Sequence, residues 1–145
     1  MDLLKKENVQ ICEEAADWRD AIRIAVKPLE EHGYVEPRYK EEIISGIERL
    51  GPYIIVAEHV ALPHARPEQG VLDTQVAVTL FRKDVSFEQE ESSARLFITL
   101  AAKDSNRHLD VLMRISEILS EDGVTDKILQ SKDVETLYHY FAPAM

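Results

Sequence analysis

The sequence has a single cysteine, Cys12, among its 145 residues. One cysteine permits no intramolecular disulfide, and the chain has no Cys-x-x-Cys spacing for zinc binding or thiol redox chemistry. We expect Cys12 to be a buried small hydrophobic residue. Glycine is also scarce, and neither the G-x-x-x-x-G-K-[ST] nor the G-x-G-x-x-G pattern of nucleotide-binding loops occurs. The G-x-S-x-G element that carries a serine nucleophile is absent as well.

Long apolar runs and positive charge are also lacking. No segment approaches the roughly 20 apolar residues that span a bilayer, and the start, Met-Asp-Leu-Leu-Lys-Lys-Glu, does not resemble a signal peptide. We therefore expect a cytoplasmic protein with no direct membrane insertion. The net charge is −10. Nucleic acid is an unsuitable partner because its phosphates need clusters of basic residues, whereas a basic protein partner would be attracted.

The chain does contain alternating strand and helix patterns, which at this length predict one domain over residues 1–145. The segments with strand patterns are 9–12, 53–57, 75–81, 96–102 and a small edge piece at 85–87. The segments with helix patterns are 18–32, 37–50, 106–120, 124–129 and 134–141. Residues 88–93 are predicted to form a solvated loop. We predict a single-domain α/β sandwich with a mixed central sheet of about five strands flanked by helices, in which 96–102 is a central strand.

Capping residues define the first two helices more closely. Asp17 is the expected N-cap of the first helix, and Gly33 ends it. Pro37 suits the first turn of the second helix, which Gly51 and Pro52 end. The expected apolar stripe of this second helix is Tyr39, Ile43, Ile47 and Leu50.

A loop between two prolines carries the first candidate functional residue, His64. Pro63 and Pro67 lie on either side of it. Each proline fixes its own φ at about −65° and disfavours helix in the preceding residue, so we expect His64 on a stiff, extended loop. Arg66 adds a permanent cation that suits a phosphate or carboxylate. The alternative is an ordinary surface histidine.

The second candidate, His108, follows another predicted strand. Ser105 or Asn106 is expected to cap the helix that follows 96–102, which places His108 in its first turn. Ends of strands and starts of helices are where α/β folds bind anionic groups, so His64 and His108 converge if their strands are neighbours. The helix dipole favours a neutral His108. The alternative is a polar first-turn residue without a role.

The other histidines have simpler interpretations. His32 is expected in solvent at the end of the first helix, His59 is expected to be exposed, and His139 either packs or faces solvent. His59 and His64 are poorly spaced for metal ligands, and we expect no metal and no cofactor. The remaining chemistry is that of a histidine nucleophile, because an imidazole near neutral pH is a competent one.

Three stretches of the sequence resemble a known family. They are Val-Glu-Pro-Arg-Tyr at 35–39, Gly-Pro-Tyr at 51–53 and Ala-Leu-Pro-His-Ala-Arg-Pro-Glu-Gln-Gly-Val at 61–71. Together they resemble the enzyme IIA (EIIA) components of the bacterial sugar phosphotransferase system, in the mannitol/fructose class (EIIA type 2) and closest to its L-ascorbate branch. The resemblance extends over essentially the whole chain.

The resemblance implies a function and a role for each candidate residue. His64 corresponds to the histidine that accepts a phosphoryl group from phospho-HPr and passes it to a cysteine of the cognate EIIB, which serves the membrane component EIIC. His108 corresponds to a second active-site histidine. The mannitol-type pattern also includes an arginine at the end of the helix before the active-site strand. Arg49 is out of register with that arginine, so Arg66 is the expected phosphate contact.

Two other functions stay open at this point. A regulatory EIIA-like domain would use histidine phosphorylation to control a partner protein. A scaffold domain with incidental histidines would not be phosphorylated at all. The acidic chain shows no attached sensor or DNA-binding segment, which favours transport over regulation.

Overall fold

The computed structural model of the protein describes residues 2–88 and 92–145. Its strands are β1 (Leu4–Cys12), β2 (Ile55–Ala57), β3 (His59–Ala61), β4 (Gln75–Ser86) and β5 (Ser93–Ala101). Its helices are α1 (Trp18–Glu31), α2 (Arg38–Leu50), α3 (Ser105–Leu119), α4 (Val124–Leu129) and α5 (Val134–Phe141), with short 3-10 turns at Pro67–Gln69 and Ala142–Ala144. The solvated loop predicted at 88–93 lies partly outside the described residues.

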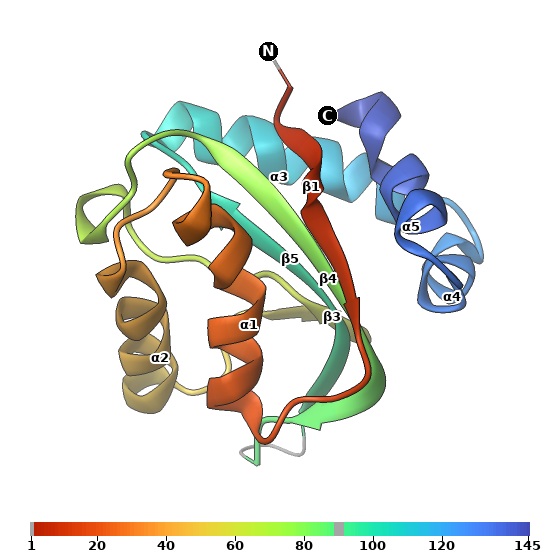
Figure 1. Ribbon diagram of the computed structural model, residues 1–145, viewed down its shortest axis with the longest axis horizontal. Helices are drawn as coiled ribbons and strands as arrows, with labels where there is room; N and C mark the ends of the chain where they lie inside the picture. The colour runs from red at the N-terminus through yellow and green to blue at the C-terminus, as the bar shows by residue number, and fades with distance from the viewer. Residues whose placement is uncertain (1, 89–91) are drawn as a thin grey trace.

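The five strands form one mixed sheet in the order β1-β4-β5-β3-β2 (Figure 1). β1 runs parallel to β4 and β3 runs parallel to β5, while the β4–β5 and β2–β3 pairs are antiparallel. β5 is therefore the middle strand, as the nearly uninterrupted apolar run at 96–102 predicted. The predicted α/β sandwich with a mixed sheet of about five strands is confirmed.

The middle strands are buried on both faces. On β5, Leu96, Ile98 and Leu100 belong to one core, and Phe97 and Ala101 belong to the other. Successive side chains of a strand point to opposite faces, so this alternation assigns each residue to one layer. Because both layers are covered by helices, neither face of β5 needs polar residues, which explains its apolar sequence.

Helices cover the two faces of the sheet (Figure 1). α1 and α2 pack on one face, where Ile22 and Ile43 are fully buried. α3, α4 and α5 pack on the other, where Ile128 and Phe141 are fully buried. Each helix has one apolar stripe, and burying that stripe against the sheet is its main source of stability. In the part of the chain that the structure describes, no helix combines the length and apolar character needed to cross a membrane.

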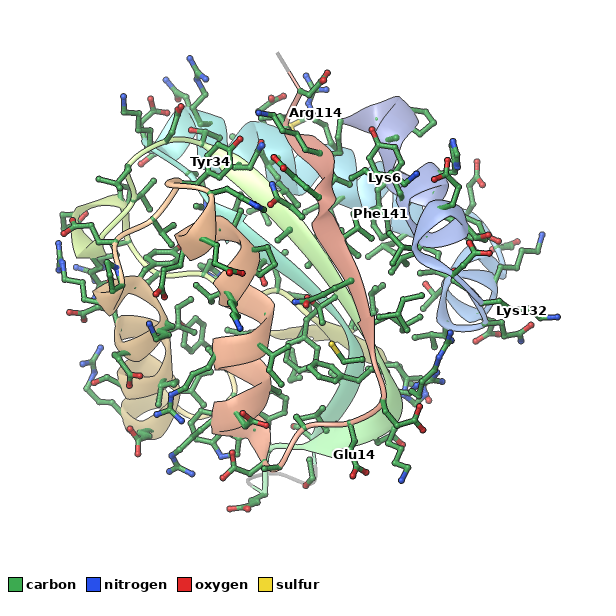
Figure 2. All side chains as sticks on the ribbon, in the orientation of Figure 1. Lys6, Glu14, Tyr34, Arg114, Lys132 and Phe141 are labelled. Carbon is green, nitrogen blue, oxygen red and sulfur yellow. The ribbon has the colours of Figure 1, made fainter. Side chains whose placement is uncertain are left out.

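Contacts at the β1–β4 edge of the sheet hold the two C-terminal helices. The Arg82 guanidinium of β4 donates to the backbone carbonyls of Ser131, at 2.5 Å, and of Lys132, at 3.0 Å. Figure 2 shows Lys6 of β1 beside α5, where it forms an ion pair with Glu135. These contacts fix the connection between α4 and α5 at the edge of the sheet farthest from β2.

An aspartate caps α3 as well as α1. Asp17 accepts a backbone hydrogen bond at the start of α1, as predicted. At α3 the cap is Asp104, whose carboxylate accepts the N–H of Arg107 at 2.8 Å, so the prediction of Ser105 or Asn106 is wrong. A carboxylate at this position satisfies a free N–H and also interacts favourably with the helix dipole. Ser105 and Asn106 are the first residues of the helix itself.

Three further expectations are corrected by the structure. The edge piece at 85–87 is not separate, because Val85 belongs to β4 and pairs with Ala94 of β5. Leu50 does not join the apolar stripe of α2 and is 67% exposed. Cys12 is only partly buried, against the core under α1. Each correction depends on how an element sits against its neighbours, which local sequence pattern does not specify.

Phe97 is the aromatic centre of the core under α1 and α2, and its removal tests that core. Its ring centroid lies 5.2 Å from that of Phe81 and 6.1 Å from that of Phe87. Phe97→Ala is expected to lower the free energy of unfolding by about 3–5 kcal/mol, because it removes a buried ring and leaves a cavity. Equilibrium urea unfolding measures the change. The control Leu72→Ala, at a side chain 49% exposed, should change it by less than about 0.5 kcal/mol.

Candidate functional site

The two candidate histidines meet because the strands that precede them are parallel neighbours. β3 and β5 run in the same direction, so the loop after β3 and the turn after β5 both start at the end of the sheet where these two strands have their C-termini. His64 lies in that loop, and His108 lies in the first turns of α3. Their ring centroids are 5.3 Å apart. The convergence that the sequence predicted is confirmed.

Backbone hydrogen bonds hold the loop after β3 against the sheet. The N–H of Leu62 donates to the carbonyl of Ile54 at 2.7 Å, and the N–H of Leu100 donates to the carbonyl of Pro63 at 3.0 Å. The second bond continues the β3–β5 contact beyond Ala61. Proline has no N–H to donate, so its carbonyl is the group that can take part here. The loop is therefore extended and fixed on the sheet side of His64.

The imidazole of His64 is held in one tautomer by its own loop. Its Nδ1 lies 2.7 Å from the backbone carbonyl oxygen of Leu62. A carbonyl can only accept, so Nδ1 carries the proton and, in the neutral ring, the lone pair lies on Nε2. The ring also contacts Tyr53 edge-on, with centroids 5.4 Å apart and planes 87° apart. His64 thus presents Nε2 as its nucleophilic atom.

His108, beside that imidazole, has a lowered pKa and is neutral near pH 7. Burial lowers the pKa of His108, and the nearby charge of protonated His64 lowers the pKa further. Both effects disfavour the imidazolium, the first because burial removes water from the charge and the second because like charges repel. The position of His108 near the start of α3 acts in the same direction.

A cavity of about 360 Å³ opens between α2, the loop after β3 and the start of α3. Both imidazoles line it. The other charged residues of its lining are Glu42, Arg49, Arg66 and Asp104. Arg49, which was expected to be out of register with the arginine of the mannitol-type pattern, lies at the end of α2 and lines the same cavity as His64.

Arg66 begins a turn that is tied to α2. Its backbone N–H donates to the side-chain oxygen of Gln69 at 2.8 Å, and the Gln69 amide donates to the carboxylate of Glu42 at 3.0 Å. The guanidinium of Arg38 adds a bond to the carbonyl of Glu68 at 2.9 Å. These contacts fix the backbone of Arg66 and leave its side chain exposed along the cavity.

The three remaining histidines lie away from the cavity. His32 is exposed at the end of α1, as predicted, and its Nδ1 lies 2.7 Å from the side-chain oxygen of Asn8. His59 is partly exposed near Asp84. His139 is 63% exposed on α5. Within residues 2–88 and 92–145, no group of three or more His, Cys, Asp or Glu residues is arranged to hold a metal ion.

The cavity combines a nucleophile with cationic and hydrogen-bonding groups. Nε2 of His64 can attack an electrophilic centre, while His108, Arg49 and Arg66 can interact with the negative oxygens around that centre. Sequence reasoning found both histidines and Arg66. It did not find Arg49 or Tyr53 as cavity residues. Their signal was the Gly-Pro pair at 51–52, which turns the chain back towards the loop directly after α2.

Comparisons of the whole sequence with known proteins agree on one family. The chain matches the family model described as "Phosphoenolpyruvate-dependent sugar phosphotransferase system, EIIA 2" over residues 2–143. It is 34% identical over 128 residues to the ascorbate-specific PTS system EIIA component of Salmonella choleraesuis strain SC-B67, covering 87% of this chain and 83% of the relative. It is also 41% identical over 112 residues to SgcA of Escherichia coli strain K12, named provisionally as a phosphotransferase IIA component, covering 77% and 78%.

A solved structure shows the same fold. The chain is similar to one in the complex of enzyme IIAMTL and phosphorylated enzyme IIBMTL from Escherichia coli, with a TM-score of 0.83 and 30% identity. The match covers 97% of this chain and 99% of that one. The likeness therefore includes every layer of the sandwich and the end of the sheet that carries the cavity.

The pKa of His108 should depend on the charge of His64. Burial is the larger cause of its lowering and repulsion by His64 the smaller, so His64→Gln is expected to raise the pKa of His108 part of the way towards its ordinary value of 6.5. NMR titration of the His108 ring protons measures the shift. The control His139→Gln removes an exposed histidine on α5 and should leave the pKa unchanged. An equal pKa in His64→Gln and the unaltered protein would show that the two imidazoles do not interact.

Proposed function

The chain belongs to the EIIA 2 family of the phosphoenolpyruvate-dependent sugar phosphotransferase system, and from this we propose that it is a cytoplasmic phosphocarrier that uses His64. It takes a phosphoryl group from phospho-HPr and passes it to a cysteine of a cognate EIIB, which supplies the membrane component EIIC. The observation that carries the proposal is the fixed Nδ1–H of His64, which directs the Nε2 lone pair to the reaction.

The transfer is a pair of substitutions at phosphorus. In the first, Nε2 of His64 forms a bond to phosphorus as the nitrogen–phosphorus bond of phospho-HPr breaks and its histidine leaves. In the second, a cysteine thiolate of EIIB attacks phosphorus and the bond to Nε2 breaks. The Nδ1 proton stays on the ring throughout. Its hydrogen bond to the Leu62 carbonyl strengthens as the ring gains positive charge, because charge-assisted bonds are stronger.

The other cavity residues act on the phosphoryl oxygens. Phosphoryl transfer depends mostly on alignment and on stabilising charge spread over the equatorial oxygens. Neutral His108 can donate a hydrogen bond, and Arg49 of α2 and Arg66 of the loop after β3 add positive charge to the lining. The first residues of α3 add the positive end of a helix dipole. Glu42 and Asp104 lie in the same lining and repel the anion, which keeps the phosphoryl group transferable.

Exposed apolar side chains near the cavity suit protein partners. Leu50 lines the cavity, and Leu109 directly follows His108 in α3. Met113 lies one helical turn further on, and both it and Leu109 are 58% exposed. Large exposed apolar residues next to a reactive group indicate a surface that a partner covers, and a partner there would exclude water from the reaction. HPr and EIIB are the two partners that the reaction requires.

L-ascorbate is the substrate that we propose for the transporter. The basis is the ascorbate-specific relative at 34% identity together with the loop sequence around His64. The carrier hands its phosphoryl group to a protein, so the cavity has no need to recognise the sugar.

Phosphorylation of His64 tests the proposed function directly. Incubation with phosphoenolpyruvate, enzyme I and HPr should add one acid-labile phosphoryl group, seen by intact mass, with NMR placing it on Nε2. His64→Gln should gain none, because the nucleophile is gone, while the control His139→Gln should gain one. Transfer onward to an ascorbate-type EIIB is then measured. A phosphoryl gain in His64→Gln would refute the site, and a stable phosphoprotein that never transfers to EIIB would favour the regulatory alternative.

Removal of the groups around the phosphoryl oxygens should slow the transfer without abolishing it. Arg49→Gln and Arg66→Gln are each expected to reduce the uptake rate about tenfold, since each loses one stabilising cation at an exposed site. His108→Ala should likewise retain partial acceptance. Rapid-quench single-turnover kinetics measure the rates. Arg19→Gln on α1 is the matched control and should transfer normally. Full transfer by His108→Ala in both directions would remove its catalytic assignment.

A further inference from the structure

One peptide group next to the proposed nucleophile is bonded by two tyrosine hydroxyls. The Tyr53 hydroxyl donates to the carbonyl oxygen of His64 at 2.7 Å. The N–H of Ala65 donates to the hydroxyl of Tyr39 at 3.0 Å. This carbonyl and this N–H belong to the same peptide unit, between His64 and Ala65. The unit is therefore held on both sides, which fixes its plane relative to the sheet.

Tyr39 connects that peptide to the middle strand. Its side chain is fully buried, and its hydroxyl donates to the carbonyl of Leu100 at 2.7 Å while it accepts from Ala65. Leu100 in turn donates its N–H to the carbonyl of Pro63. Burial raises the pKa of Tyr39, so its hydroxyl stays protonated. The phenol therefore joins α2, the end of β5 and the loop in one hydrogen-bonded unit.

Tyr53 adds a wall for the imidazole as well as a hydroxyl. Its ring meets His64 edge-on, and its hydroxyl holds the carbonyl of the same residue. The place of this ring depends on Gly46 of α2, because a Cβ added there would lie 3.3 Å from the Tyr53 hydroxyl and 3.4 Å from its ring. Gly46 therefore leaves the space that Tyr53 needs to reach the loop.

We propose that Tyr39 and Tyr53 are positioning residues for phosphoryl transfer, which hold the His64–Ala65 peptide and so aim Nε2 of His64. The inference rests on the proposed function. The bond from Nδ1 to Leu62 sets the tautomer, but the ring can still swing with its own backbone. Fixing ψ of His64 and φ of Ala65 removes that freedom. In-line transfer depends steeply on alignment, and a displacement of about 1 Å can cost up to about a hundredfold in rate.

Kinetics of conservative variants test the proposal. Tyr53→Phe keeps the ring and loses only the hydroxyl, and we expect its maximal uptake rate from phospho-HPr to fall about tenfold with KM unchanged. Tyr53→Leu, which also loses the edge contact, should be slower still. Gly46→Ala should slow transfer by displacing an intact Tyr53. Tyr39→Phe should lower both the rate and the melting temperature, because it leaves buried backbone groups unpaired.

The matched control is Tyr138→Phe, which removes the same hydroxyl from α5, where Tyr138 packs on the other core. It should transfer at the full rate. A change confined to stability in Tyr53→Phe, with an unchanged maximal rate, would overturn the proposal, because a purely structural bond need not affect alignment.

A second readout does not depend on transfer. Nitrogen and proton NMR signals of the His64 ring in the unphosphorylated protein report its tautomer and orientation. They should shift or broaden in Tyr53→Phe and stay unchanged in Tyr138→Phe. Identical ring signals in Tyr53→Phe and the unaltered protein would overturn the proposal. If the unaltered protein accepts no phosphoryl group, the carrier function fails, and the ring signals alone decide whether the tyrosines hold His64.

Discussion

The parallel pairing of β3 with β5 is the constraint on which the rest of the site depends. β3 is only three residues long, yet it pairs in parallel with the middle strand. The segments that follow Ala61 and Ala101 therefore start at the same end of the sheet. Register is equally important: Ala61 lies opposite Phe97, and the bond from Leu100 to Pro63 continues the contact into the loop. Without that pairing, His64 and the start of α3 would not lie at the same end of the sheet and would not line one cavity. This one pair of strands brings His64 and α3 together. The bond that sets the His64 tautomer, the two arginines and the two tyrosines then determine the detailed arrangement of the cavity.

The electrostatics of the cavity differ from those of the whole chain. The net charge of −10 argues against nucleic acid as a partner. The cavity differs from this overall charge, because Arg49 and Arg66 line it together with a neutral His108. Two carboxylates share the lining and also support the structure, since Asp104 caps α3 and Glu42 accepts a hydrogen bond from Gln69. An anion in the cavity therefore meets attraction and repulsion together. This balance suits a carrier, because an intermediate bound too tightly would be slow to leave.

Local signals predicted much of the fold, and tertiary contacts decided the rest. α4 and α5 begin and end at the predicted residues because their signals are local: Gly123 precedes α4, and Asp133 precedes α5 and caps it. β3 was not predicted, since three residues show no period, and β4 runs past Phe81 through three charged residues because β5 pairs with it. In the site, proline context and strand ends identified both histidines. The apolar stripe predicted Tyr39 on the buried side of α2, but not the contact of its hydroxyl with the loop. Arg49 and Tyr53 could not be placed, because the packing of the end of α2 and of the turn after it against the loop is a tertiary contact.

The groups that hold the proposed nucleophile, His64, and the groups that a partner would contact come from different parts of the chain. His64 is held by the Leu62 carbonyl and by two buried or half-buried phenols, all fixed by the sheet and α2. The surface around it is made of exposed side chains such as Leu109 and Met113, which can change without disturbing the core. Methionine in particular adapts its shape to different surfaces. The fold can therefore keep the same proposed chemistry while the exposed side chains around the cavity change to suit another EIIB. On this view the transported sugar is specified at the partner-facing surface and in the partner.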